Sequence, residues 1–261
     1  MQKKKKRISA KKIIFAIVIL IVILFIIFAL TSKTADKTEQ KNTGLTTETK
    51  ETYFFSVNIS ENAVKMYLPA VDNEGNGVLT LLTVEARPGK GRTLVDIDNL
   101  LFWADTQHSI RVAKKVAQEI TKINLSNYDI IYNIYANASI IGGESAGAAL
   151  TIATIAALQN KTLNDKVIIT GTINHDGTIG PVSAIMAKAK AAKAGGANLF
   201  LVPLLQSREV VYETRKHCEK IGPAEFCSIE QVPKRINVSE EANITVIEVG
   251  SIEEAIAYFI K

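Results

Sequence analysis

A serine set among small residues, Ser145 in the segment IGGESAG (141–147), is the first candidate for chemistry. It directly precedes residues 146–158, an uncharged apolar run that predicts a helix buried on all sides. A serine at a helix N-terminus lies among backbone N–H groups without intrahelical partners, and such groups can stabilise a developing oxyanion. The glycines leave room for a substrate carbonyl. The same residues also fit a plainer alternative, a helix cap whose small side chains serve packing.

A serine nucleophile needs a base, and the segment SAIMAKAKAAKA (183–194) offers three lysines. A lysine can serve if burial lowers its pKa from about 10.4 towards 7–8. At about 100° per residue, Lys188 shares a helix face with alanines, whereas Lys190 and Lys193 point to the opposite side. We therefore expect Lys188 to be buried and its two neighbours to be solvated. The alternative is a Lys188 that extends from the helix edge into water.

The segments around these residues alternate between strand and helix patterns. The periodicity of apolar residues predicts strands at 78–86, 128–135, 166–170 and 198–202 and helices at 105–120, 146–158 and 183–194. Ser251 with Glu254 forms a capping box that opens a last helix. Strands alternating with helices predict an α/β fold with a mixed sheet.

Three motifs in order resemble the proteolytic domain of Lon-type proteases, especially stand-alone bacterial and archaeal members without an ATPase domain. They are Ser145-Ala146-Gly147, the segment TGTINHDGTIGPV (170–182), and Lys188 followed by an Ala-Ala-x-x-Gly-Gly run. The likeness extends upstream to VLTLLTVEARPGKG and covers roughly residues 77–205. It implies a Lon-like fold and a catalytic Ser145–Lys188 dyad, in which Pro181 and Ala191-Ala192 fix the register of the lysine. The separation of 43 residues is also the one that the family shows.

Two positions depart from the family pattern. Ser183-Ala184 stands where the family usually has Gly-Gly before the lysine helix, and Glu144 stands where it has proline or aspartate. The first departure bears on how the lysine helix begins, and neither touches the dyad. The resemblance also assigns the family's threonine near the dyad to Thr170, whose hydroxyl could orient the ammonium or only bond to backbone. We count Thr170, Glu144 and Ala146 as supporting site residues.

Two other functions stay open from the residues alone. The segment GESAG (143–147) also satisfies the G-x-S-x-G pattern of α/β-hydrolases, so an esterase could use the same serine. It would need a downstream histidine, and His175 and His217 are the two available; His175, in the turn NHDG, is typical of an exposed loop residue. The other possibility is a catalytically silent, membrane-anchored binding module, against which the intact serine and lysine argue.

The N-terminal segment predicts a membrane anchor. Residues 13–30 are 18 consecutive apolar residues, about 27 Å long as a helix, which is close to the thickness of a bilayer core. Residues 1–12 form a basic tail with seven Lys and Arg, so the N-terminus is expected in the cytoplasm and the remainder outside. A cleaved signal peptide is the alternative, although its apolar region is normally shorter. Residues 31–52 predict a flexible linker, and residues 53–261 one protease domain.

Composition limits the other partners. The net charge of +5 is concentrated in the basic tail, so it does not indicate a nucleic-acid binder. The chain has no GxxxxGK[ST] phosphate loop, and we expect ATP-independent hydrolysis of polypeptides without cofactor or metal. The resemblance suggests a homo-oligomeric ring. Cys218 and Cys227 could close a small disulfide loop outside the cell or remain free thiols inside it.

Overall fold

The computed structural model describes residues 60–96, 101–102, 104–136, 140–141 and 143–260. All of these residues belong to one compact unit, Thr52–Lys261. The expected basic tail, membrane helix and linker, residues 1–52, lie outside the described residues. Within the described part of the chain, no helix is both long and apolar enough to cross a membrane.

A four-stranded sheet forms one layer of the unit, with the strand order β1-β2-β5-β3. Its strands are β1 (Val64–Val71), β2 (Gly77–Pro88), β5 (Tyr128–Tyr135) and β3 (Thr93–Val95). β1 and β5 both pair antiparallel with β2, whereas β3 pairs parallel with β5. The sheet is therefore mixed, as the alternation of strands and helices predicted.

A second sheet contains three parallel strands, ordered β13-β10-β7. These are β13 (Thr245–Val249), β10 (Leu199–Pro203) and β7 (Val167–Ile169). β7 and most of β10 are buried residue after residue, which is the pattern expected of parallel strands covered on both faces. Their apolar runs do not alternate for that reason.

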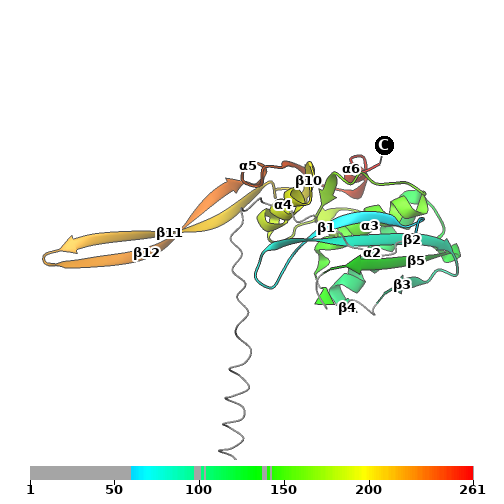
Figure 1. The fold of residues 1–261 in the computed structure, drawn as a ribbon, viewed down its shortest axis with the longest axis horizontal. Helices are drawn as coiled ribbons and strands as arrows, with labels where there is room; N and C mark the ends of the chain where they lie inside the picture. The colour runs from blue at the N-terminus through cyan, green and yellow to red at the C-terminus, as the bar shows by residue number, and fades with distance from the viewer. Residues whose placement is uncertain (1–59, 97–100, 103, 137–139, 142, 261) are drawn as a thin grey trace, which may run out of the picture. The chain divides into compact units, whose positions relative to one another are not determined.

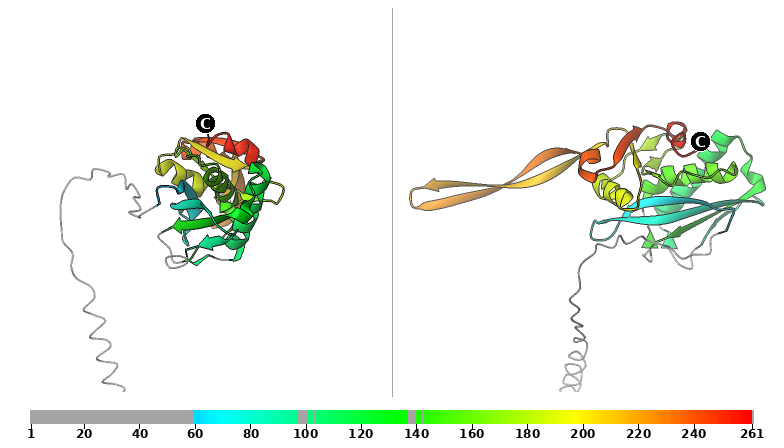
Figure 2. Two further views of the ribbon diagram at one scale, coloured as in Figure 1. Left: turned by 90° about the vertical axis from the view of Figure 1, so that its right-hand side faces the viewer. Right: turned by 45° about the horizontal axis from the view of Figure 1, so that its top comes forward.

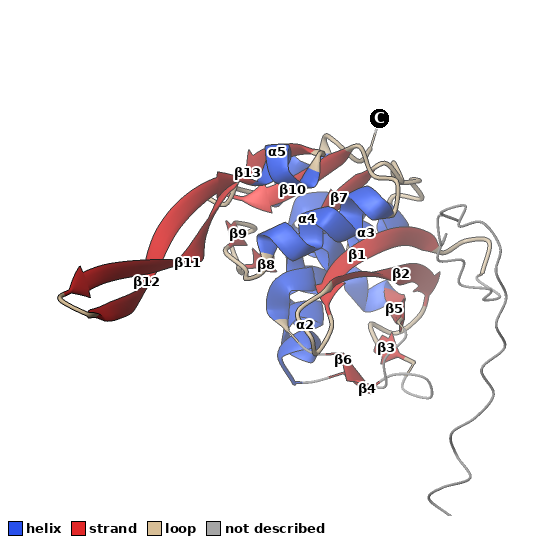
Figure 3. Cartoon of the chain, turned by 60° about the vertical axis from the view of Figure 1, so that its left-hand side comes forward, coloured by secondary structure: helices blue, strands red, loops and turns tan. Residues whose placement is uncertain are grey.

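Three helices pack between and beside these sheets (Figures 1 and 3). α3 (Gly147–Leu158) is central, with every residue from Gly147 to Ala156 buried, and it packs on α2 (Ala104–Thr121) and on β2. α4 (Ile185–Ala194) packs on β1 and β2. Because α3 carries no charged side chain, its burial takes no charge out of water, and its sequence therefore suits this central position.

Short elements complete the unit. They are β4 (Leu101–Phe102), β6 (Ile140–Ile141), β8 (Thr172–Ile173), β9 (Ile179–Gly180), α5 (Val238–Ala242), α6 (Ile252–Ile256) and the 3-10 turns η1 (Leu125–Asn127) and η2 (Glu144–Ala146). The predicted cap of α6 is confirmed, since the Ser251 hydroxyl accepts from the N–H of Glu254 at 3.3 Å. The Glu254 carboxylate accepts from the N–H of Gly250 instead of that of Ser251.

A long hairpin, which we call the arm, extends away from the packed layers (Figures 1 and 2). It consists of β11 (Arg208–Ile221) and β12 (Ala224–Asn237), paired antiparallel along their whole length. Gly222 at its turn has a φ of 65°, as primed hairpin turns require. A disulfide joins Cys218 and Cys227 near that turn. The sequence left this pair open, and no strand was predicted there.

The predicted elements are otherwise recovered with small shifts at their ends. The strand at 128–135 has the expected bounds, and the helix at 105–120 is one residue longer at each end. The helix at 183–194 begins two residues later, at Ile185, because Ala184 adopts a left-handed conformation with a φ of 56°. The strand at 78–86 extends from Gly77 to Pro88.

Candidate active site

Ser145 lies in η2, the turn that leads into the buried helix α3, and its side chain is half-buried. The carbonyl of Ser145 accepts two hydrogen bonds, from the N–H of Gly171 at 3.0 Å and from the hydroxyl of Thr170 at 3.3 Å. The N–H of Ala148 donates in turn to the carbonyl of Gly171 at 3.0 Å. The serine turn is therefore fixed by backbone bonds to the segment that follows β7.

Asp105, in the first turn of α2, fixes the other side of this turn. Its carboxylate accepts from the N–H of Gly143 at 2.8 Å, two residues before the serine. The Thr106 hydroxyl lies 3.4 Å from the carbonyl of Gly143, and Gly143 itself has a φ of 105°, which favours glycine. The sequence analysis missed Asp105, because nothing local to α2 indicates a bond 38 residues along the chain.

Gly147 lets the serine turn approach β8. A Cβ at this position would lie 2.6 Å from Cγ2 of Ile173 and 2.8 Å from its backbone nitrogen, closer than side chains tolerate. The glycine after Ala146 in the Ser-Ala-Gly motif thus serves close packing between α3 and β8. This packing holds the Ser145 turn against the same segment that carries Thr170.

Lys188 points into the protein from α4, as predicted, and is only 3% exposed. Ala189, Ala191 and Ala192 are buried around it, whereas Lys190 and Lys193 are exposed. The alternative of a solvated Lys188 is therefore wrong. Burial of the ammonium lowers the pKa of Lys188 to about 8, because the charged form loses its hydration.

Thr170 connects the lysine with the serine turn. The Lys188 ammonium donates to the Thr170 hydroxyl at 3.5 Å, and that hydroxyl donates to the Ser145 carbonyl at 3.3 Å. Thr170 is fully buried. Both expected partners of the Thr170 hydroxyl, the lysine ammonium and a backbone carbonyl, are therefore present together. A neutral lysine amine at this position could accept a proton near neutral pH, which is what a serine nucleophile requires.

The other residues named from the sequence lie at varied positions. Ala146 is half-buried and packs on the main core, and Glu144 is exposed at the start of η2. His175 is exposed in its turn, as expected, with its ring edge-to-face to that of His108 at 6.2 Å between centroids. His217 is an exposed residue of the arm, 3.2 Å from the Glu219 carboxylate.

Two further features of the described residues lie apart from Ser145 and Lys188. A cavity of about 190 Å³ is lined by residues of β2 and β5 together with Ser60 and Ala63, and its Glu85 carboxylate is paired with Arg87 at 2.6 Å. Among the described residues, one group has side-chain atoms close enough together to hold a metal ion, and it consists of Cys218, Glu225 and Cys227. The two sulfurs are joined in the disulfide, so they offer no thiolates to a metal.

Comparison with known proteins identifies the protein family of this chain. The model of the Lon protease (S16) C-terminal proteolytic domain matches residues 80–251, which is more than half of the chain. The Archaeal Lon protease of Thermoplasma acidophilum is 26% identical over 161 residues, which cover 61% of this chain and 24% of the relative. The Lon protease of Buchnera aphidicola is 30% identical over 146 residues, 54% of this chain and 18% of the relative. This chain spans a quarter or less of the length of these relatives.

The matched region contains both candidate residues, Ser145 and Lys188, and the Thr170 between them. It also contains the segment 143–147 on which the α/β-hydrolase alternative rested, so that alternative is set aside. The motifs, the mixed α/β fold and the family match agree with one another. The chain belongs to the family of the Lon protease (S16) C-terminal proteolytic domain, whose members are serine-type peptidases.

Proposed function

We propose that this protein is a serine endopeptidase in which Ser145 attacks the peptide carbonyl and Lys188 takes the serine proton. The observation that carries the proposal is the burial of Lys188, which lowers its pKa to about 8. Its ammonium donates to the Thr170 hydroxyl, which in turn donates to the backbone carbonyl of Ser145. A general base works best when its pKa lies near the working pH.

The chain contributes three things to this reaction. The neutral amine of Lys188 accepts the proton, and the Thr170 hydroxyl orients the amine. The positive end of the α3 helix dipole, which lies next to the Ser145 turn, favours a developing oxyanion. After the leaving amine takes a proton from Lys188, water can hydrolyse the ester formed on Ser145 by the same route in reverse.

The test uses the purified full-length chain in detergent with a fluorogenic peptide and an unfolded protein as substrates. Ser145→Ala and Lys188→Ala should each abolish hydrolysis, because each removes one of the two reacting groups. Lys190→Ala and Lys193→Ala are matched controls on the exposed face of the same helix and should retain the wild-type rate. A wild-type chain without activity would favour a silent binding module.

We further propose that hydrolysis needs no ATP. The support is the sequence, which contains no phosphate loop. ATP with magnesium should leave the rate of the purified chain unchanged, and a reproducible stimulation would refute this part of the proposal. Without an ATP-driven unfoldase, the substrates would be loose segments or already unfolded polypeptides.

We also propose that the chain is a single-pass membrane protein with residues 13–30 in the bilayer and the protease domain outside the cytoplasm. The apolar run and the seven cationic residues before it support this orientation. The substrates would then be exported and membrane proteins. Assembly into a homo-oligomeric ring is a further expectation from the family, which sedimentation of the detergent-solubilised chain would test.

A further inference from the structure

The lysine helix α4 has no cap of its own. Its N-cap residue, Ala184, makes no capping hydrogen bond through its side chain. Ala184 also has φ 56° and ψ 41°, a left-handed conformation that is strained for any residue with a Cβ. This is one of the positions where the sequence departs from the glycines of the resembled family. Such a conformation persists only where the surroundings impose it.

Two side chains near the start of β11 bond to the backbone on either side of Ala184, at Val182 and at Met186. Gln206 makes a pair of bonds to Val182, since its amide oxygen accepts from the Val182 N–H at 3.0 Å and its amide nitrogen donates to the Val182 carbonyl at 2.6 Å. Glu209, the second residue of β11, accepts from the N–H of Met186 at 2.9 Å. The carboxylate thereby takes the place of the missing cap and lies at the positive end of the helix dipole.

These bonds act on the turn that carries Lys188. The N–H of Lys188 donates to the carbonyl of Ala184 at 3.1 Å, so Ala184, Met186 and Lys188 share the first turn of α4. On the other side of the helix, Gly77 of β2 approaches so closely that a Cβ there would overlap the carbonyl of Ala187. α4 is therefore contacted by β2 at Ala187 and by the start of β11 at Met186.

We propose that Gln206 and Glu209 are positioning residues. They fix the first turn of α4 and so determine where the Lys188 amine lies relative to Thr170 and Ser145. Where it concerns catalytic rate, this inference rests on the proposed peptidase function. Neither side chain touches a reacting group. Their effect passes through the backbone of residues 182–186, and because Glu209 belongs to β11, it also makes the arm part of the support of the lysine helix.

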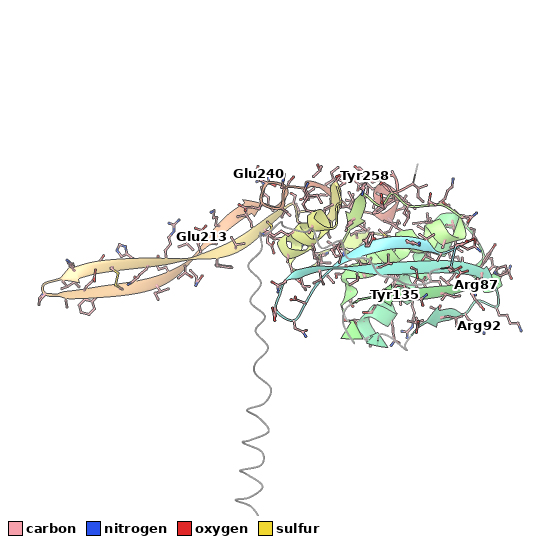
Figure 4. The ribbon with its side chains drawn as sticks, in the orientation of Figure 1. Arg87, Arg92, Tyr135, Glu213, Glu240 and Tyr258 are labelled. Atoms are coloured by element: carbon pink, nitrogen blue, oxygen red, sulfur yellow. A yellow bond between two sulfur atoms is a disulfide. The ribbon has the colours of Figure 1, made fainter. Side chains whose placement is uncertain are left out.

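The test compares Glu209→Ala and Gln206→Ala with Glu213→Ala in the full-length chain. Glu213 is the matched control, a glutamate four residues along the same strand, paired with Lys234 at 2.7 Å (Figure 4). Glu209→Ala should lower kcat on the order of tenfold with KM nearly unchanged, because a misplaced base affects the chemical step and not binding. Glu209→Gln keeps an acceptor oxygen and should retain most of the rate. Adding Ala184→Gly should restore part of the Glu209→Ala loss by removing the backbone strain.

A second readout does not depend on peptidase activity. Acetic anhydride labelling of lysines at pH 7–11, followed peptide by peptide by mass spectrometry, gives the titration midpoint of the Lys188 amine. Glu209→Ala should raise that midpoint, because a loosened helix admits water to the ammonium. If Glu209→Ala matches Glu213→Ala in kcat and in the Lys188 midpoint, the inference is overturned. If the wild type lacks activity but the midpoint still moves, the positioning role stands and the peptidase proposal fails.

Discussion

Lys188 is buried without a carboxylate partner among the groups that perturb it, and that is unusual for a lysine. Burial is the cause of its lowered pKa, and the hydrogen bond it makes is to a neutral hydroxyl, that of Thr170. Buried charges in proteins are normally paired, because an unpaired one is destabilising. A lysine kept in this state has little structural benefit to offer, and its burial supports the proposed role of Lys188 as a base.

The rate of peptide hydrolysis should follow the titration of Lys188. With a pKa of about 8, the amine is mostly protonated at pH 7 and mostly neutral at pH 9. We therefore expect kcat/KM to rise roughly tenfold per pH unit below about pH 8 and to level off above it. A pH–rate profile on a peptide without ionisable side chains would measure this. A rate-limiting group that titrates near 6.5 would instead implicate a histidine.

Replacing Lys188 should stabilise the fold while it removes activity. The pKa of Lys188 is about 8 in the folded protein and 10.5 for an ordinary lysine, so the unfolded chain binds more protons between these pH values. The penalty of burying the ammonium is thus full below pH 8 and disappears as the pH rises to about 10.5. The difference between these two pKa values corresponds to a free-energy penalty of at most about 3 kcal/mol.

Lys188→Met keeps the length of the side chain and removes its charge. We expect its free energy of unfolding to exceed that of the wild type at pH 7, and the two to converge towards pH 10. Urea unfolding of both proteins at the two pH values would measure this. Lys190→Met, on the exposed face of α4, is the control and should show no such pH dependence. A Lys188→Met protein less stable than wild type at pH 7 would contradict the argument.

At the scale of elements, the junction of η2 and α3 depends on Gly147. Alanine normally favours a helix over glycine by about 1 kcal/mol. Here its Cβ would meet the backbone nitrogen of Ile173 at 2.8 Å, and that backbone cannot move without disturbing β8. Overpacking of this kind costs about 1–3 kcal/mol, so the steric effect outweighs the gain in propensity.

Gly147→Ala should therefore lower the melting temperature and also reduce hydrolysis, because the Ser145 turn is fixed to the segment that would shift. Thermal unfolding by circular dichroism and a peptidase assay would measure the two effects. Ile173→Ala removes one of the two close contacts and should rescue only part of the loss. An alanine variant as stable as wild type would show that β8 yields easily.

Much of this arrangement could be predicted from the sequence because the signals are local. The strand at 128–135 and the buried helix after Ser145 follow from runs of apolar residues. The inward face of α4 follows from the alanines beside Lys188. Asp105 and Glu209 could not be found in the same way, since each acts on a segment 38 or 23 residues away.

The arm was missed for a different reason. Strands are recognised by apolar residues on one face, and the arm is mostly exposed on both, so charged residues occur along its two strands. Pro233 lies within β12, which also argues against a strand unless that strand is at an edge. The pair Gly222-Pro223, between the two strands, was the one local signal of a hairpin turn.

At the scale of the whole molecule, the arm and its disulfide bear on the cellular compartment in which the protease domain lies. A two-stranded hairpin is at best marginally stable in water. The pairing register of β11 and β12 places two exposed side chains on the same face of the arm as the disulfide. They are Tyr212, which is 67% exposed, and Ile229, which is 71% exposed. The Cys218–Cys227 bond closes the end of this hairpin and limits its fraying. Disulfides persist in oxidising compartments, which supports the proposed location outside the cytoplasm.

That location can be tested on intact cells. Carrying the seven cationic residues of the basic tail across the membrane is unfavourable, so the protease domain should be the part that is translocated. Protease added to cells without their outer wall layer should cleave within residues 31–52 and release a soluble fragment. A membrane-impermeant thiol reagent should label Cys218 and Cys227 only after an impermeant reductant is added. Full protection until lysis, together with thiols that react without reductant, would place the domain in the cytoplasm and reverse the proposed topology.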